Sequence, residues 1–301
     1  MSEARSQQIL RLSNYMASGV PYISGVYSPL INTITNNANI ILKKSTDNWY
    51  TIRSTGGDHT MDSLVVGDAS DGTFTEVTIA PTISVVGALD ASYYRHFQIR
   101  WWDSSNIAVF TLDVDSPYDL KLYTINISTG VSTSVGTLIS GVLRGKNGIC
   151  VCVNNTYVYV YTTRVDTGIN SYIKRYLKTD IATTVEYDMP LLYFYSGTYY
   201  RYMLYPIIAV TTNYLWAVNM NASTDEASLY MFPLTNIQIG TCIGNGLQNS
   251  FLDNGMFHFQ TDYDMTTMYF MPRNYSPLDY SSGVSGIVYI TESDLIKYGA
   301  L

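Results

Sequence analysis

Charged side chains are scarce in this chain. Only 14% of its 301 residues are charged, against roughly 25% in ordinary soluble domains. The 17 Lys and Arg residues are outnumbered by 24 Asp and Glu residues, which gives a net charge of −7. A surface of this sign repels a phosphate backbone, so the sequence argues against nucleic-acid binding.

Cysteine and histidine, which hold many protein metals, occur three times each. The cysteines are Cys150, Cys152 and Cys242. The histidines are His59, His96 and His258. No histidine lies within four residues of another histidine or of a cysteine, so we predict no metal and no cofactor. Cys150 and Cys152 alternate in one apolar run and should share one face of a strand, where a disulfide between them would be strained. We interpret all three cysteines as small buried hydrophobes.

Long apolar runs are also missing. No stretch approaches the roughly 18 apolar residues of a membrane span, so no membrane partner is expected. The N-terminus lacks the apolar core of a secretory signal. From this we expect the protein to leave the cell inside a virion or another extracellular assembly, or otherwise to stay in the cytoplasm.

What the chain does contain is a repeat. Short polar turns recur between runs rich in Val, Ile, Tyr, Trp and Phe. The first series of turns is centred on Asn48, Asn106, Asn155, Asn213 and Asp264. The second series begins at Asp71, Thr129, Thr179, Thr235 and Ser293. Each first turn precedes its second turn by 22 to 29 residues, and the whole unit repeats about every 54 residues. A period in this range with hairpin turns is typical of a β-propeller.

The repeat predicts an all-β fold, a five-bladed β-propeller of four-stranded antiparallel blades. The inner strands are expected at residues 39–44, 96–102, 149–153, 207–211 and 256–261. We predict two regions, an N-terminal arm over residues 1–36 and the propeller over residues 37–301. The fifth blade runs out of chain after Asp294, so its outer strand comes either from residues 295–301 or from a piece of residues 22–35. We favour the second arrangement, because it pairs two sheet edges that would otherwise be open.

The N-terminal arm is expected to begin with a short amphipathic helix over residues 4–16. Its apolar positions are Ile9, Leu10, Leu12 and Met16. They fall on roughly one helical face. Since a closed propeller already buries its own repeats, we interpret them as anchors for a partner subunit. The alternative is that the helix packs on its own propeller.

In repeat length, blade count and turn pattern the chain resembles the five-bladed propeller families. These include the tachylectin-type lectins and the arabinanase and invertase type glycosidases. The resemblance covers most of the chain and implies the architecture. No family-specific motif is present, so it carries over no site residues.

One face of the predicted propeller has acidic and aromatic loops. Each connection between second and third strands contains an aspartate, and the five are Asp58, Asp115, Asp166, Asp225 and Asp279. The connections into inner strands add Tyr93, Tyr94, Tyr193, Tyr195, Tyr199, Tyr200 and Arg201. A ring of aspartates could bind a cation or sugar hydroxyls, although aspartate is also a common turn residue. If these tyrosines are exposed, they would form a sugar-stacking or protein-docking face. If they are buried, they are ordinary packing of a long loop on its own blade.

Catalysis would require two carboxylates at the mouth of the channel. The expected inner strands contain no acidic residue, and Asp90 and Asp253, which precede inner strands, are the best acid candidates. We therefore predict that the protein is not an enzyme. We expect a structural or host-attachment component of a virion or phage surface, whose partners are other structural proteins and a surface glycan. The alternatives are a lectin-like carbohydrate-binding propeller and, second, a glycoside hydrolase.

Overall fold

The structure is a computed structural model of the chain, and twenty strands are named in the part that it describes. The described residues are 22–23, 41–43, 48–53, 60–68, 73–84, 97–113, 119–141, 149–163, 171–189, 208–221, 226–248, 258–271, 287–293 and 296.

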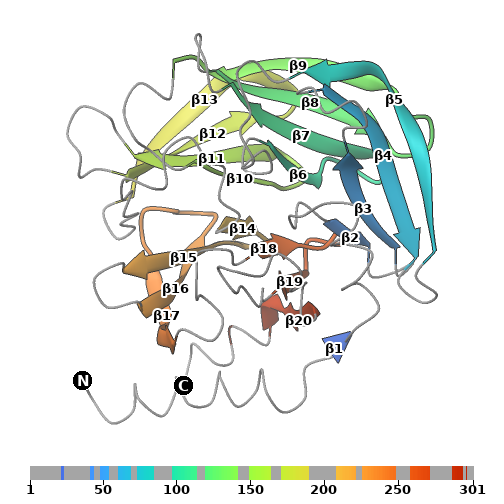
Figure 1. Cartoon of the computed structure of the whole chain (residues 1–301). Coiled ribbons are helices and arrows are strands. Elements are labelled where there is room, and N and C mark those ends of the chain that lie inside the picture. Colours follow the sequence, from blue (N-terminus) through green and yellow to red (C-terminus); the bar gives the residue numbers. More distant parts are fainter. Residues whose placement is uncertain are drawn as a thin grey trace.

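These strands form five four-stranded antiparallel sheets, the blades of a β-propeller (Figure 1). Blade 1 contains β2 (Ile41–Lys43), β3 (Asn48–Arg53), β4 (Thr60–Asp68) and β5 (Phe74–Ser84). Blade 2 contains β6 (Phe97–Trp101), β7 (Asn106–Leu112), β8 (Leu120–Asn126) and β9 (Ser132–Ile139). Blade 3 contains β10 (Cys150–Val153), β11 (Tyr157–Thr163), β12 (Ser171–Leu177) and β13 (Asp180–Asp188). Blade 4 contains β14 (Ile208–Val210), β15 (Tyr214–Asn221), β16 (Glu226–Pro233) and β17 (Thr241–Gln248). The predicted fold class is confirmed.

Blade 5 is built from both ends of the chain. Its strands are β18 (His258–Thr261), β19 (Thr267–Met271), β20 (Ile287–Thr291) and, on the outside, β1 (Tyr22–Ile23). In the register of this pair, Tyr22 lies opposite Val288 and Ile23 opposite Ile287. The N-terminal segment therefore supplies the closing strand, which is the arrangement favoured from the sequence. The proposed helix over residues 4–16 lies outside the described residues, and the boundary at residue 36 stays a prediction.

The blades stack because their second strands are apolar on both faces. In β7, six of the seven residues are buried, which is typical of strands covered by a neighbour on each side. Ile107 and Val109 pack in a core with blade 1 residues, and Ala108 and Phe110 pack in a core with blade 3 residues. The outer strands are polar instead, and β13 has no fully buried residue. The pattern of apolar residues therefore sets the order of strands in a blade. Strands with many buried residues lie near the axis, and strands with exposed residues lie at the rim.

The described polar turns of both series lie on one face of the ring, which we call the turn face. Side-chain oxygens hold the first turns closed: Asn154 Oδ1 accepts the Thr156 and Tyr157 N–H groups at 2.9 and 2.7 Å. Asp103 and Asp264 accept backbone N–H groups of their own turns in the same way. These are Asx turns, which explains why Asn and Asp recur there.

A backbone hydrogen bond joins the two turns within each of four blades. In each case the residue that follows the third strand donates its N–H to a carbonyl of the first turn. The pairs are Ile127 to Ser105, Lys178 to Thr156, Leu234 to Asn213 and Glu292 to Thr266. The two turn series are regularly spaced in the sequence because this spacing brings the N–H group after the third strand next to the carbonyl of the first turn.

At the same repeat position, two charged side chains reach into the preceding blade. The Glu292 carboxylate of blade 5 accepts hydrogen bonds from the Thr211 hydroxyl and the Asn213 amide of blade 4, the latter at 2.8 Å. The Lys178 ammonium of blade 3 donates to the Trp102 carbonyl of blade 2 and lies 4.4 Å from the Trp102 ring centroid. These contacts join neighbouring blades at the turn face.

Candidate functional site

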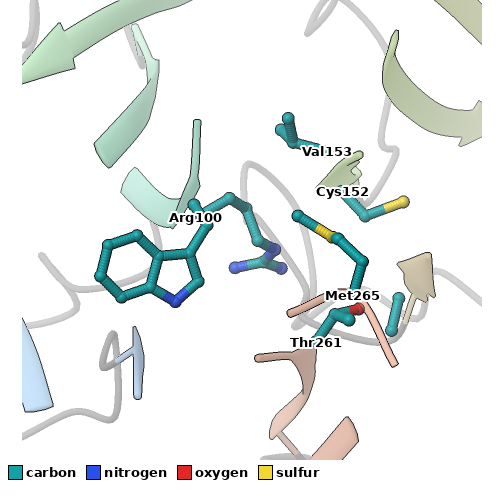
Figure 2. A pocket seen from close by; sticks show the side chains of 7 residues that line it. Arg100, Cys152, Val153, Thr261 and Met265 are labelled. Atoms are coloured by element: carbon teal, nitrogen blue, oxygen red, sulfur yellow. The ribbon is translucent and has the colours of Figure 1, made fainter. Parts of the chain in front are cut away.

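The axis of the propeller ends, at the turn face, in a small pocket between four inner strands and one turn (Figure 2). The lining residues, which we call the channel floor, are Arg100, Trp101, Cys152, Val153, Ala209, Thr261 and Met265. Most of them lie within the last two residues of an inner strand, because these strands converge before they enter their first turns. The pocket has about 10 Å³ of free volume, room for a single water molecule.

Arg100 is the central side chain of the channel floor, and its guanidinium points into the pocket (Figure 2). It is only 4% exposed. Nε donates to the Val151 carbonyl of the next blade at 3.0 Å, and Nη1 donates to the Ile99 carbonyl at 2.8 Å. Nη2 donates to Gln98 Oε1 at 2.7 Å. A buried charge is tolerated when such bonds replace water, so Arg100 is a fixed part of the floor that links blades 2 and 3.

Cys152 faces the same pocket. Burial raises the pKa of this thiol well above its ordinary value, and the nearby Arg100 charge opposes the rise. Burial therefore favours the protonated thiol over the thiolate. Cys150 is buried as well, as predicted, whereas Cys242 is only half-buried, so the expectation of full burial was wrong for that residue. Cys242 lies in the outer strand β17, where one face meets solvent.

Met265 has an unusual backbone conformation for its residue type. It lies in the first turn of blade 5 with φ of 56°, a left-handed conformation that costs free energy in residues other than glycine. Its side chain is only 4% exposed and packs into the core of blades 1 and 2. The backbone holds this turn in place, since the Met265 carbonyl accepts the Thr212 N–H of blade 4 at 2.9 Å. The strained backbone conformation of Met265 thus places its apolar side chain at the channel floor.

An aromatic layer lies beside the channel floor. Trp101 makes edge-to-face contacts with Tyr50 and Tyr263, at centroid distances of 5.2 and 5.6 Å. Lys43 Nζ lies 5.9 Å from the Trp101 ring centroid and 5.2 Å from the Tyr263 ring centroid. Such contacts stabilise packing by roughly 0.5–1.5 kcal/mol each. This layer belongs to the apolar core that joins blades 1 and 2 beside the channel floor.

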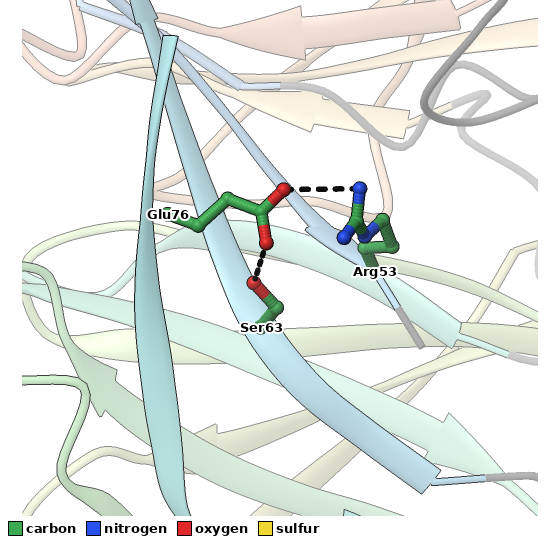
Figure 3. Close-up of polar contacts among 3 residues, drawn as sticks. All are labelled: Arg53, Ser63 and Glu76. Carbon is green, nitrogen blue, oxygen red and sulfur yellow. Dashed lines mark hydrogen bonds and ion pairs between the residues drawn. The ribbon is translucent and has the colours of Figure 1, made fainter. Parts of the chain in front are cut away.

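Three polar residues of blade 1 form a network across the sheet (Figure 3). Glu76 of β5 accepts from the Ser63 hydroxyl of β4 at 2.9 Å and pairs with Arg53 Nη1 of β3 at 3.0 Å. The network links three adjacent strands. Its charges are about one third exposed, so we assign it a modest contribution to stability.

Asp113 is a buried carboxylate that sequence reasoning missed. It follows β7, is fully buried, and pairs with Lys121 Nζ at 2.6 Å. Burial alone would lower the pKa of Lys121, but the hydrogen bond and charge of Asp113 raise it overall. Asp113 also donates its backbone N–H to the Asp119 carbonyl at 3.0 Å. This pair fixes both ends of the connection over residues 114–118, away from the turn face. The only signal in the sequence was an acid at the end of an apolar run.

The residues that the sequence analysis proposed for binding lie outside the described residues. These are Tyr93, Tyr94, Tyr193, Tyr195, Tyr199, Tyr200, Arg201, Asp58, Asp115, Asp166, Asp225 and Asp279, the acid candidates Asp90 and Asp253, and the anchoring residues Ile9, Leu10, Leu12 and Met16. The described strands on either side of residues 54–59, 85–96, 114–118 and 142–148 have their nearer ends at the face opposite the turn face. The inner strands, as far as they are described, carry no acidic residue.

Two further searches cover only the described part of the chain. No group of three or more His, Cys, Asp or Glu side chains in it could hold a metal ion. No helix in it has the length and apolar character to cross a membrane.

Comparisons with known proteins give a fold but no family. No protein-family model matches the chain, and no curated protein matches it. Among solved structures it is similar to the α-L-arabinofuranosidase PaAbf62A from Podospora anserina, with a TM-score of 0.51 and 11% identity over 84% of this chain and 89% of that one. The α-L-arabinofuranosidase Arb93A from Fusarium graminearum matches with a TM-score of 0.44 and 11% identity over 92% and 98% of the two chains. An uncharacterized protein from Listeria monocytogenes matches with a TM-score of 0.37 and 12% identity, and the chain spans 65% of its length.

These findings correct the functional prediction. We expected a non-enzymatic structural or attachment protein of a virion, and that prediction is contradicted: a solved structure that matches this chain with a TM-score of 0.51 is an α-L-arabinofuranosidase, and no finding points to a virion. The prediction failed because low charge and abundant Tyr, Asn and Thr describe any hydroxyl-rich surface. The likeness itself establishes the propeller fold. Partner and location stay predictions.

Proposed function

We propose that this chain is a carbohydrate-active propeller that hydrolyses glycosidic bonds. The observation that carries the proposal is the five-bladed fold, which resembles an arabinofuranosidase along most of both chains. The small size of the pocket at the channel floor supports it from another direction. Because this pocket has room for a single water molecule, we expect a sugar chain to approach from the face opposite the turn face, and we place the aspartate-bearing connections there as part of the proposal.

The proposal gives those aspartates specific roles. Glycoside hydrolysis needs one carboxyl group to protonate the leaving oxygen and another to act as nucleophile or base. We assign these roles to a pair among Asp90, Asp253 and the five aspartates between second and third strands. Tyrosines of the connections before blades 2 and 4 would stack on sugar rings. The Asp113 and Lys121 pair would help to hold Asp115 in place, because it fixes the ends of the connection over residues 114–118.

The test is a screen of the purified chain against aryl glycosides, beginning with aryl α-L-arabinofuranosides, and against neutral and acidic polysaccharides. We expect turnover with at least one substrate. Replacing each candidate aspartate by Asn should then lower kcat by about 10²- to 10⁴-fold at two positions. Asp180→Asn is the matched control, because Asp180 is an exposed turn-face residue that only closes its own turn.

Two results would contradict the proposal. One is the absence of turnover across the panel with a folded protein. The other is turnover that survives every one of the seven Asp→Asn changes. Tight binding of a sugar without turnover would instead support the lectin-like alternative.

A further inference from the structure

Blade 3 carries a row of tyrosines on one face. Tyr157, Tyr159 and Tyr161 alternate along β11 with Val158 and Val160, which pack into the core shared with blade 2. Because side chains of a strand alternate between faces, the tyrosines lie on the other face. Tyr159 and Tyr161 are buried, whereas Tyr157 is half-exposed.

Arg175 lies in the middle of that face, on β12. In the strand register it is opposite Tyr159 on one side and Val185 on the other. Its guanidinium carbon lies 4.3 Å from the Tyr157 ring centroid and 5.3 Å from the Tyr187 ring centroid. Two rings from the strands on either side therefore hold the guanidinium of a central strand. This orders a side chain that would otherwise lose rotamer entropy on binding a ligand.

The hydrogen-bonding edge of this guanidinium is not used within the described part of the chain. No hydrogen bond or ion pair to another described residue is formed by Arg175, in contrast to Arg53, which pairs with Glu76. The acidic neighbour on β13, Glu186, is opposite Lys174 and hence on the other face of the sheet. Val185, the residue opposite Arg175, is 43% exposed, so solvent reaches this part of the blade.

We propose that Arg175, held by Tyr157 and Tyr187, binds a carboxylate of an acidic sugar. The rings occupy the neighbourhood of the guanidinium faces, so a ligand must approach its edge, where the N–H groups form a planar fork. A carboxylate matches that fork with two parallel hydrogen bonds. A uronic acid is a sugar that carries such a group, and choosing a sugar as its source rests on the proposed function. The site is on the side of blade 3, separate from the axis, and would hold a polysaccharide while another part is hydrolysed.

The test measures binding by the full chain, with no need for turnover. The probes are a short oligogalacturonide, its methyl ester, in which the carboxylates are neutralised, and inorganic phosphate. Calorimetric or NMR titrations at low ionic strength should show binding of the oligogalacturonide, with affinity at least about tenfold lower for the ester and for phosphate. Arg175→Gln should lower the oligogalacturonide affinity about tenfold, and Arg175→Lys should lower it less, because a point charge replaces the fork.

Arg53→Gln is the matched control. It removes the same charge from a half-exposed strand position of another blade, where the guanidinium is already paired with Glu76. Its affinity should stay within about twofold of the unmodified chain, since only long-range charge changes. Equal affinity in Arg175→Gln and the unmodified chain would overturn the proposal, as would equal binding of the ester or of phosphate. A chain that binds through Arg175 but hydrolyses nothing would leave this site standing and refute the hydrolase proposal alone.

Discussion

Asp264 illustrates how a single side chain fixes the ring. Its carboxylate closes the first turn of blade 5, accepting the Thr266 and Thr267 N–H groups at 2.8 and 2.9 Å and the Thr267 hydroxyl at 3.0 Å. Partial burial alone would raise the pKa of Asp264, but these hydrogen bonds outweigh it and the pKa is lowered. The same turn carries the strained Met265 under the axis. By closing this turn, Asp264 helps to hold Met265 in its place at the channel floor.

Replacing Asp264 by Ala should lower the free energy of unfolding by about 1 kcal/mol at pH 7, since the three hydrogen bonds that its carboxylate accepts from Thr266 and Thr267 of the same turn are lost. Because the folded pKa is below the ordinary value, the ionised form stabilises the fold above that value. The stabilisation is lost as pH falls through the lowered pKa. Denaturant titrations of both chains at pH 7 and near pH 2 measure this. A difference between the chains that is as large at pH 2 as at pH 7 would contradict the account.

At the scale of elements, the turns between third and fourth strands join blades as well as strands. In blade 2, Asn126 Oδ1 accepts the Thr129 N–H at 3.0 Å, and Gly130 follows with φ of 71°. The Gly130 carbonyl accepts the Ala80 N–H of blade 1 at 3.0 Å. A Cβ atom at Gly130 would lie 1.9 Å from the Thr78 carbonyl oxygen. Glycine is therefore needed there for both its backbone conformation and its small size.

Gly130→Ala should destabilise the protein by about 2–4 kcal/mol, the sum of a left-handed alanine and a backbone collision. Gly141→Ala is the matched control: its φ is 68°, yet a Cβ atom would meet nothing within 4 Å. It should cost only about 1 kcal/mol. Thermal unfolding of both variants measures the difference. Equal losses would mean that the contact between blades 1 and 2 contributes nothing.

At the scale of the whole molecule, the ring is closed by two residues. Without β1, the backbone edge of β20 would have no strand beside it at this end of blade 5. Open edges are free to pair with other chains, and closed rings avoid this. Blade 4 would still hold Glu292 through Thr211 and Asn213, so the ring has a second connection near its closure.

Deleting residues 1–24 should therefore lower the melting temperature by about 5 °C or more and promote association at high concentration, because the edge of β20 is uncovered. Deleting residues 1–16 keeps Tyr22 and Ile23 and should leave the melting temperature unchanged. Calorimetry and light scattering on the two truncated chains distinguish the outcomes. If both chains lose the same stability, residues 1–16 matter to the fold and β1 does not.

The sequence by itself determined the five blades, their four strands and the turn chemistry. Each of these depends on local rules: alternating apolar residues make strands, and Asn, Asp and Gly make turns. The repeat shows them five times, so an irregular position in one repeat does not hide the pattern. The closing strand followed from counting strands against chain length. The composition alone, however, led to a wrong function.

Only the tertiary structure decided which polar residues meet. Arg100 reaches Val151, and Glu292 reaches Asn213, across about 50 and 80 residues of sequence. The same holds for Arg175 between Tyr157 and Tyr187, and for Asp113 with Lys121. No local pattern marks such residues, because their pairing depends on how strands align in a sheet and how blades face one another. The repeat in the sequence determines the blades of the ring. Contacts between different segments determine which polar side chains lie next to one another.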